Sequence, residues 1–233
     1  MTHGWTSLSL ALLTGLLVSA QRTRPAPTPF FEDSFDGTGL DPSWRVLHPD
    51  LATVSVTNGA LRIAPNQGGL ATIWYQDAEG ALVYRNVTGD FTATARVHAR
   101  LPGSALPPLV SYRLGGILAR RPGSTAGDRD SVHVALGAGV PAMPVCAEDK
   151  TTVDSVSDFL LHPIPSADGE LRLRRRGARF SMAWRPFGAG PWMPLRSHLR
   201  PDLPATLQVG LMAYSADAPA DLELRFDRFR LEP

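Results

Sequence analysis

Carboxylate pairs are the first residues to test for chemistry, because hydrolysis of a glycosidic bond needs two carboxyl groups flanking that bond. The candidate pairs are Glu148 and Asp149, Asp154 and Asp158, and Glu223 and Asp227. Glu148 and Asp149 are adjacent, so in a strand they would point to opposite faces. Asp154 and Asp158 are four residues apart with no third acid at a suitable offset, and Glu223 and Asp227 are four apart but lie in the closing strand. The sequence therefore predicts no paired acid and base.

The sequence also gives little support for a catalytic nucleophile or a metal site. Cys146 is the only cysteine, so no intramolecular disulfide and no thiolate cluster can form. Its nearest histidines in the sequence are His133 and His162, and a lone cysteine is usually a small buried apolar residue. The chain has no Gly-x-Ser-x-Gly elbow and no phosphate-binding loop of the Walker type. The six histidines show no metal-ligand spacing.

A run of arginines has a pattern that could bind an anion. Arg172, Arg174 and Arg176 alternate along a predicted strand and so share one face. Two interpretations stay open, a face solvated by water and a face that binds an anionic ligand.

The elements that must position these residues are short strands. Phe91–Arg100 alternates apolar and polar residues, as a half-buried strand does, and Asn58-Gly59 is a strong hairpin signal. Glycine and proline, 21 of each, interrupt any helical run. The nearest helix-like candidate, Asp154–Leu161, is short and poorly patterned. The apolar phase shifts within the closing segment, Asp221–Leu231, which predicts a β-bulge near Asp227. The sequence therefore predicts an all-β sandwich or barrel.

The N-terminus indicates export. Leu8–Ala20 is apolar but shorter than the roughly 20 residues that span a bilayer, and Val18-Ser19-Ala20 suits signal peptidase. We predict a signal peptide over 1–20 with cleavage after Ala20, a disordered proline-rich segment over 21–29 and one domain over 30–233. The alternative is a buried N-terminal helix. The predicted location is secreted or periplasmic.

Charge and hydropathy limit the partners. The formal net charge is +1, whereas a nucleic-acid-binding domain is usually strongly basic. No later apolar stretch is long enough to cross a membrane. The sequence does not predict an oligomeric state.

Several short motifs resemble the concanavalin A-like lectin/glucanase superfamily, and their order and spacing carry the resemblance more than any one of them. They are Phe31-Glu-Asp-Ser-Phe35, Leu40-Asp-Pro-Ser-Trp44, Gly59-Ala-Leu-Arg-Ile63, Val87-Thr-Gly-Asp-Phe91, Gly115-Gly-Ile-Leu-Ala-Arg120 and Phe226-Asp-Arg-Phe-Arg-Leu231. Within the superfamily, the chain is similar to a bacterial branch sometimes labelled "regulation of enolase protein" and to the accessory sandwich domain of some β-xylosidases. The resemblance covers nearly all of residues 30–233.

The resemblance implies a two-sheet antiparallel jelly roll with six or seven strands per sheet and with the first and last strands as neighbours. It places Trp44 in the core. Glucanase members carry their acids on one strand as Glu-x-Asp-x-x-Glu or nearly so, a spacing that this chain lacks. Members that bind sugar do so on a concave sheet face.

A sugar site on such a face would combine aromatic stacking surfaces with planar polar groups. The candidates are Tyr75, Trp74, Tyr112, Arg120, His133, Trp184 and Trp192. For each tryptophan the alternative is the core, and Trp184 shares parity with Phe180 and Met182, which favours the core. Tyr75 has the opposite parity to Trp74 and is the better candidate for an exposed ring.

A calcium site is a further candidate, because hard cations need several oxygen ligands. Asp33, Asp36 and Asp41 lie near the first strand, and the resemblance places Asp227 of the last strand alongside. The favoured alternative is that these carboxylates cap turns and pair with arginines.

Three hypotheses for function follow. The leading one is a secreted, non-catalytic module that binds a polysaccharide or another glycan. The second is a glycoside hydrolase or lyase with displaced acid residues, and the third is a structural or protein-interaction domain without a small ligand.

Overall fold

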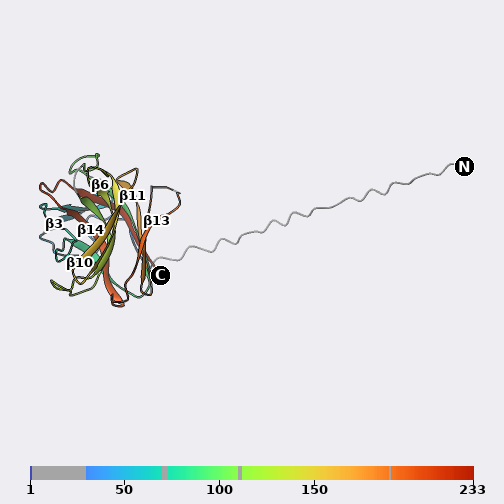
Figure 1. The fold of residues 1–233 in the computed structure, drawn as a ribbon. Coiled ribbons are helices and arrows are strands. Elements are labelled where there is room, and N and C mark those ends of the chain that lie inside the picture. Colours follow the sequence, from blue (N-terminus) through green and yellow to red (C-terminus); the bar gives the residue numbers. More distant parts are fainter. Residues whose placement is uncertain (2–29, 70–72, 110–111, 189) are drawn as a thin grey trace.

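The computed structural model describes residue 1 and residues 30–69, 73–109, 112–188 and 190–233, and these form two packed antiparallel sheets (Figure 1). No helix occurs in those ranges. The predicted signal peptide and proline-rich segment fall almost wholly on residues 2–29, outside the described residues. Within the described residues, none forms a helix that could span a membrane.

The eight-stranded sheet has the order β13-β12-β11-β6-β15-β4-β3, with β1 also paired to β15. Its strands are β1 (Phe31–Asp33), β3 (Ala52–Thr57), β4 (Ala60–Pro65), β6 (Phe91–Arg100), β11 (Asp168–Arg176), β12 (Arg179–Arg185), β13 (Met193–Leu199) and β15 (Glu223–Glu232). The first and last strands are neighbours, as the resemblance implied.

The seven-stranded sheet has the order β10-β9-β8-β7-β14-β5-β2. Its strands are β2 (Arg45–Leu47), β5 (Leu82–Thr88), β7 (Arg113–Arg120), β8 (Ser131–Ala138), β9 (Cys146–Val153), β10 (Val156–Pro163) and β14 (Thr206–Ser215). The helix-like candidate over Asp154–Leu161 is therefore mostly strand β10, because cross-strand pairing with β9 outweighs weak local propensity.

Local sequence signals explain several connections. Asn58 and Gly59 both have positive φ, 52° and 68°, which is the geometry of the tight turn that joins β3 to β4. The register of β15 against β6 shifts between Phe226 and Arg228, which confirms the predicted bulge. The bulge lets Phe226 and Phe229 both point into the core despite their opposite parity.

The main core lies between the two sheets and contains the large buried rings, including those of Trp184, Phe91 and Phe180. Trp44 is also in this core, as predicted. A second apolar cluster, which includes Leu118, Cys146, Met212 and Tyr214, lies on the outer face of the seven-stranded sheet. An outer sheet face is usually polar, so this second cluster marks the place where other parts of the chain cover the sheet.

Candidate functional site

An aromatic pocket of about 190 Å³ lies on the outer face of the seven-stranded sheet. We call it the aromatic pocket; its lining residues are Ile73, Tyr75, Tyr112, Lys150, Phe159, Tyr214 and Ala216. Its volume lies below the roughly 300–1,000 Å³ of pockets for drug-sized ligands, so it suits a single ring and not a longer ligand.

Strand alternation and one crossing segment build the aromatic pocket. Lys150 of β9 and Phe159 of β10 are direct cross-strand partners, so their side chains rise together from the sheet. Tyr214 comes from β14, and Tyr112 immediately precedes β7. Tyr75 comes from the connection between β4 and β5, which crosses the outer face of the sheet to reach β10. Strands therefore supply the floor and connections supply the walls.

The aromatic rings are held edge to face. The Phe159 ring centroid lies 6.2 Å from that of Tyr75 and 6.1 Å from that of Tyr112, with interplanar angles of 82° and 85°. Such pairs gain about 0.5–1.5 kcal/mol beyond the burial of their area. Tyr75, Tyr112 and Phe159 remain partly exposed, so a solute can reach the apolar surface that they share.

Lys150, the only lysine of the chain, brings an ammonium group into this apolar setting. Its Nζ donates to the main-chain oxygen of Trp74 at 3.2 Å and lies 3.1 Å from Glu148 Oε1. It also lies 5.0 Å from the Phe159 ring centroid and 5.3 Å from that of Tyr214. The rings therefore stabilise the cation through their negative faces while one carboxylate balances its charge.

Glu148 lies fully buried below Lys150 and gathers three donors on one oxygen. Besides Lys150, His133 Nε2 and the Tyr214 hydroxyl each donate to Glu148 Oε1 at 2.7 Å. Burial alone would raise the pKa of Glu148, but the charge of Lys150 and these hydrogen bonds outweigh it and lower the pKa to about 2. Oε2 has no hydrogen-bond partner among the described residues.

Burial also sets the protonation of the neighbouring groups. It lowers the pKa of His133, which is therefore neutral at neutral pH and donates through Nε2. Burial, and then the charge of Glu148, raises the pKa of the Cys146 thiol to about 12. The thiol is unreactive as a nucleophile, as the sequence suggested.

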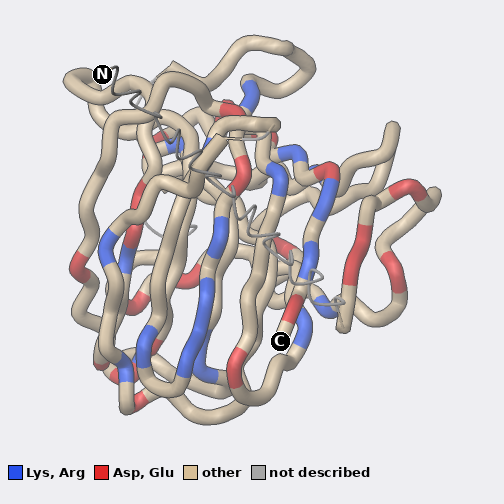
Figure 2. Tube along the Cα trace, turned by 90° about the vertical axis from the view of Figure 1, so that its right-hand side faces the viewer, with Lys and Arg blue, Asp and Glu red and all other residues tan. Residues whose placement is uncertain are grey.

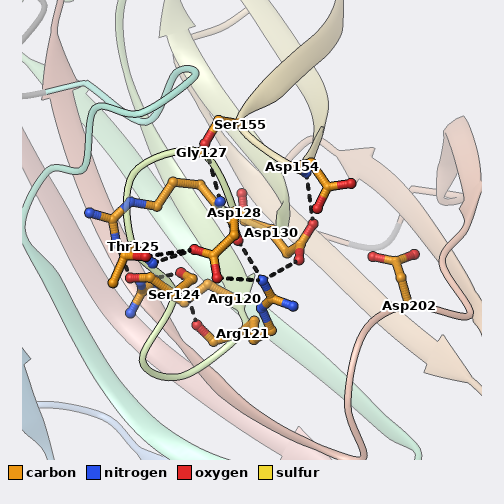
Figure 3. Close-up of polar contacts among 12 residues, drawn as sticks. Arg120, Arg121, Ser124, Thr125, Gly127, Asp128, Asp130, Asp154, Ser155 and Asp202 are labelled. Atoms are coloured by element: carbon orange, nitrogen blue, oxygen red, sulfur yellow. Dashed lines mark hydrogen bonds and ion pairs between the residues drawn. The ribbon is translucent and has the colours of Figure 1, made fainter.

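The segment that carries Tyr75 is fixed by polar contacts of the two residues that follow it. The Gln76 amide donates to Ser157 Oγ of β10 at 2.8 Å, and the Gly127 amide donates to Asp77 Oδ1 at 2.6 Å. Gly127 belongs to the β7–β8 loop, whose own contacts are shown in Figure 3. In that loop Arg121 contacts Asp128 and Asp130. The wall of the aromatic pocket is thereby held by strand β10 and by the β7–β8 loop.

Arg120 lies beside the aromatic pocket and not in its lining. Its guanidinium pairs with Glu79 and donates to Gln208 at 2.6 Å and to Ser124 at 2.9 Å (Figure 3 shows the Ser124 contact). Glu79 also binds Arg129 and His48. Because the side chains of Arg120 and Glu79 are both almost fully buried, this pair holds the β4–β5 connection down on the sheet.

The structure brings together some of the predicted sugar-binding residues and separates others. Tyr75 and Tyr112 line the aromatic pocket, Trp74 is buried behind it and His133 lies beneath it. Trp184 is 1% exposed in the main core, where its parity with Phe180 and Met182 placed it. Trp192 lies on the outer face of the other sheet, against Arg172 and Arg185. The seven candidates therefore do not form one site.

Sequence reasoning missed Phe159, Tyr214, Lys150 and Glu148 as parts of the site. A usable signal was the alternation in Cys146-Ala-Glu-Asp-Lys150, which puts Glu148 and Lys150 on one strand face. Phe159 was hidden in the helix-like candidate segment. The same alternation sends Asp149 to the opposite face, as predicted, where Arg196 Nε donates to it at 2.6 Å.

The candidate calcium ligands do not converge, and Asp41 accepts from the Ser43 amide in its own turn. Asp33 accepts hydrogen bonds from the Phe35 amide and from the Trp44 indole. Asp36 accepts from Ser34, and Asp227 contacts His98 and Arg96. Among the described residues no group of acidic, histidine and cysteine side chains could hold a metal ion. These carboxylates cap turns and form ion pairs and do not fit a calcium site.

Comparison with known proteins supports the fold. The chain matches no protein-family model and no curated protein sequence. Among solved structures it is similar to a xylan β-1,4-xylosidase from Bacillus halodurans, with a TM-score of 0.65, 18% identity, 91% of this chain covered and 40% of that chain. This chain thus spans about two fifths of that protein.

Two further structures match over nearly their whole length. A pseudo β-1,3-glucanase and immunostimulatory antigen of Mycobacterium tuberculosis has a TM-score of 0.56 and 15% identity, with 88% of this chain and 98% of that chain covered. A lectin from Bauhinia forficata, solved with GalNAc, has a TM-score of 0.56 and 11% identity, with 87% of this chain and 96% of that chain covered. At these identities the likeness shows the fold alone, which is a two-sheet antiparallel β-sandwich.

Proposed function

We propose that this protein is a secreted, non-catalytic carbohydrate-binding module of the concanavalin A-like lectin/glucanase superfamily, and that it holds one sugar ring in the aromatic pocket. The aromatic pocket itself carries the proposal. Tyr75, Tyr112 and Phe159 offer partly exposed ring surfaces against which the apolar face of a sugar can stack. The hydroxyls of Tyr75 and Tyr112 can exchange hydrogen bonds with the hydroxyls of the sugar.

The charges around the aromatic pocket support an uncharged ligand. Lys150 is the charged group of the lining, and Glu148 neutralises it from below at 3.1 Å. A ligand of either sign would therefore gain little Coulomb energy while it lost its hydration. Neutral sugars are the class that this balance favours.

The same groups support binding in preference to hydrolysis. No carboxylate lines the aromatic pocket among the described residues, and the nearest, Glu148, is fully buried with a lowered pKa. A glycosidase acid needs a raised pKa and contact with the leaving oxygen. Glu148 offers neither. The solved structures of similar fold include both a xylosidase and a lectin, so the fold is compatible with either role.

A glycan array followed by calorimetric titration of the best ligand tests the proposal. We expect the substitution Phe159→Ala to weaken binding about two- to tenfold, because stacking on one ring contributes about 0.5–1.5 kcal/mol. Leu160→Ala is the matched control: Leu160 is the next residue of β10, is 45% exposed and points to the other face. We expect that variant to bind as the parent chain does.

Two results would contradict the proposal. One is a folded protein that binds no neutral glycan on the array, and the other is an equal loss of affinity in both variants. The melting temperature of each variant checks that it remains folded. Release of reducing sugar from the bound glycan would support the enzymatic alternative instead.

A further inference from the structure

Arginines are concentrated on the outer face of the eight-stranded sheet, opposite to the face with the aromatic pocket. In the part of the chain that the structure describes, eleven arginines alternate there with buried apolar residues of β4, β6, β11, β12 and β15. Figure 2 shows basic residues in blue recurring along adjacent strands. Because the chain as a whole is nearly neutral, this concentration is local.

Most of these arginines have their charge compensated. Seven of the eleven contact a carboxylate; Arg225 and Arg62, for example, share Glu223, and Arg228 and Arg230 share Glu32. The remaining four are Arg172, Arg174, Arg176 and Arg179, which we call the arginine track. None of the four contacts an aspartate or glutamate side chain in the ranges that the structure describes, although Arg176 donates to the main-chain oxygens of Phe91, Arg175 and Pro233.

The arginine track forms a continuous row. Arg172, Arg174 and Arg176 are alternate residues of β11, so their Cα atoms are about 6.6 Å apart. Arg179 is the direct cross-strand partner of Arg176 on β12. The neighbours of Arg172 and Arg174 on the flanking strands are small: Thr94 and Ala183 for the first, Thr92 and Ser181 for the second. A chain-like ligand can therefore lie along the row without a bulky residue in its way.

Trp192 adds an aromatic surface at one end of the row. The guanidinium carbons of Arg172 and Arg185 each lie 4.4 Å from its ring centroid, and the ring is only half-buried. Partial burial and the charges of Arg174 and Arg185 lower the pKa of Arg172. The like charges around Arg172 thus oppose one another.

The repulsion among these arginines bears on the two interpretations that the sequence left open, a face solvated by water and a face that binds an anionic ligand. It favours the second. Like charges directly opposite on neighbouring strands destabilise a sheet. The arginines of β4, β6 and β15 on this face have acidic partners, and so does Arg185 of β12, which pairs with Glu170, whereas the arginines of the arginine track have none. An anionic ligand would remove it.

We propose that the arginine track binds an acidic polysaccharide, with carboxylate or sulfate groups on the guanidinium groups and one sugar ring against Trp192. The guanidinium fork matches such oxyanions in two-point contacts. The ring of Trp192 favours a sugar over a simple polyanion. A nucleic acid is disfavoured because the formal net charge of the chain is only +1. The site is separate from the aromatic pocket and does not depend on it.

Affinity measurements with matched polymers test this. The probes are polygalacturonate and dextran sulfate, their neutral counterparts, methyl-esterified polygalacturonate and dextran, and oligothymidylate of similar length. We expect at least one acidic polysaccharide to bind more tightly than its neutral counterpart, with an affinity that falls as salt rises. We expect Arg174→Gln with Arg179→Gln to weaken that binding at least about tenfold, since each is a charge-assisted contact.

The matched control is Arg228→Gln with Arg230→Gln, which removes the same charge from the same sheet face but from arginines that already pair with acids. We expect it to weaken binding less than about threefold. Equal losses in the two double variants would overturn the proposal, as would no preference for either acidic polymer or tighter binding of oligothymidylate. Phe159→Ala should leave this binding unchanged, so failure here is distinct from failure of the aromatic pocket.

Discussion

Lys150 and Glu148 form a buried ion pair whose value depends on both partners. Each charge is costly to remove from water, and the cost is offset by the mutual attraction together with the hydrogen bonds from His133 and Tyr214. The pair therefore fixes the floor of the aromatic pocket without adding net charge to it.

Removing one partner of the Lys150–Glu148 pair should destabilise the fold more than removing both partners. We expect Glu148→Gln to destabilise the fold by about 3–5 kcal/mol, because it leaves Lys150 as an uncompensated buried cation. Combining it with Lys150→Met should recover much of that loss. Urea unfolding of the single and double variants measures this, and free energies that simply add would contradict it.

The two lowered pKa values of this cluster predict a loss of stability in acid. The unfolded chain takes up protons first, at His133 below about pH 6.5 and at Glu148 below about pH 4.5. For Glu148 the stabilisation is fully present above pH 4.5 and is lost as the pH falls to about 2, an effect of roughly 3 kcal/mol.

Urea midpoints measured from pH 8 to pH 3 test this dependence. We expect a decline that begins near pH 6.5, and we expect His133→Gln to remove the part between pH 6.5 and pH 5 because an amide does not titrate. A midpoint that stays level down to pH 4 would show that the cluster does not control acid stability.

For single residues, the alternation along a strand could reveal which face of the sheet a side chain points to. Alternation separated Glu148 from Asp149 and placed Trp184 in the core correctly. It could not show that Tyr214 and His133, which are 66 and 15 residues from Glu148, donate to the same oxygen. That convergence depends on the order of strands in the sheet, which local patterns do not encode.

At the scale of elements, the strands followed from the sequence and the crossing connection did not. A period-2 pattern predicted β6, the Asn58-Gly59 signal predicted the turn that leads into β4, and the phase shift predicted the bulge in β15. The β4–β5 connection has no such pattern. Its path is set by distant partners such as Ser157 and Gly127, so sequence reasoning could not place Tyr75 beside Phe159.

Close packing between the sheets predicts a strict requirement for glycine in β7. A Cβ atom on Gly115 would lie 2.5 Å from both the Leu224 side chain and the main-chain oxygen of Met212. We expect Gly115→Ala to destabilise the fold by about 1–3 kcal/mol through overpacking. Gly39→Ala, where a Cβ meets nothing within 4 Å, is the control. Equal melting temperatures for the two variants would contradict this.

For the whole molecule, the two outer faces differ in chemistry. One is covered by the β4–β5 connection and carries the aromatic pocket, and the other, which Phe187 and Trp192 of the β12–β13 connection contact, carries the arginine track. If both proposals hold, the protein can bind a neutral sugar and an acidic polymer at once, on opposite sides of a sandwich.

Export is a separate prediction about the whole chain. We propose that expression with its native N-terminus in a bacterial host yields an extracytoplasmic protein that begins at Gln21, because Leu8–Ala20 has the length and ending of a signal. Fractionation and N-terminal sequencing measure this. A product that keeps residues 1–20 and stays in the cytoplasm would contradict it.

The position of β15 within its sheet also affects the order in which the strands can pair during synthesis. β15 hydrogen-bonds to β6, β4 and β1, so three strands made earlier share a partner that is made after them. Until β15 emerges, β6 and β4 have a gap between them and the main core stays open. Pairing over such long sequence separations is slow. The eight-stranded sheet therefore cannot close until β15 has been made.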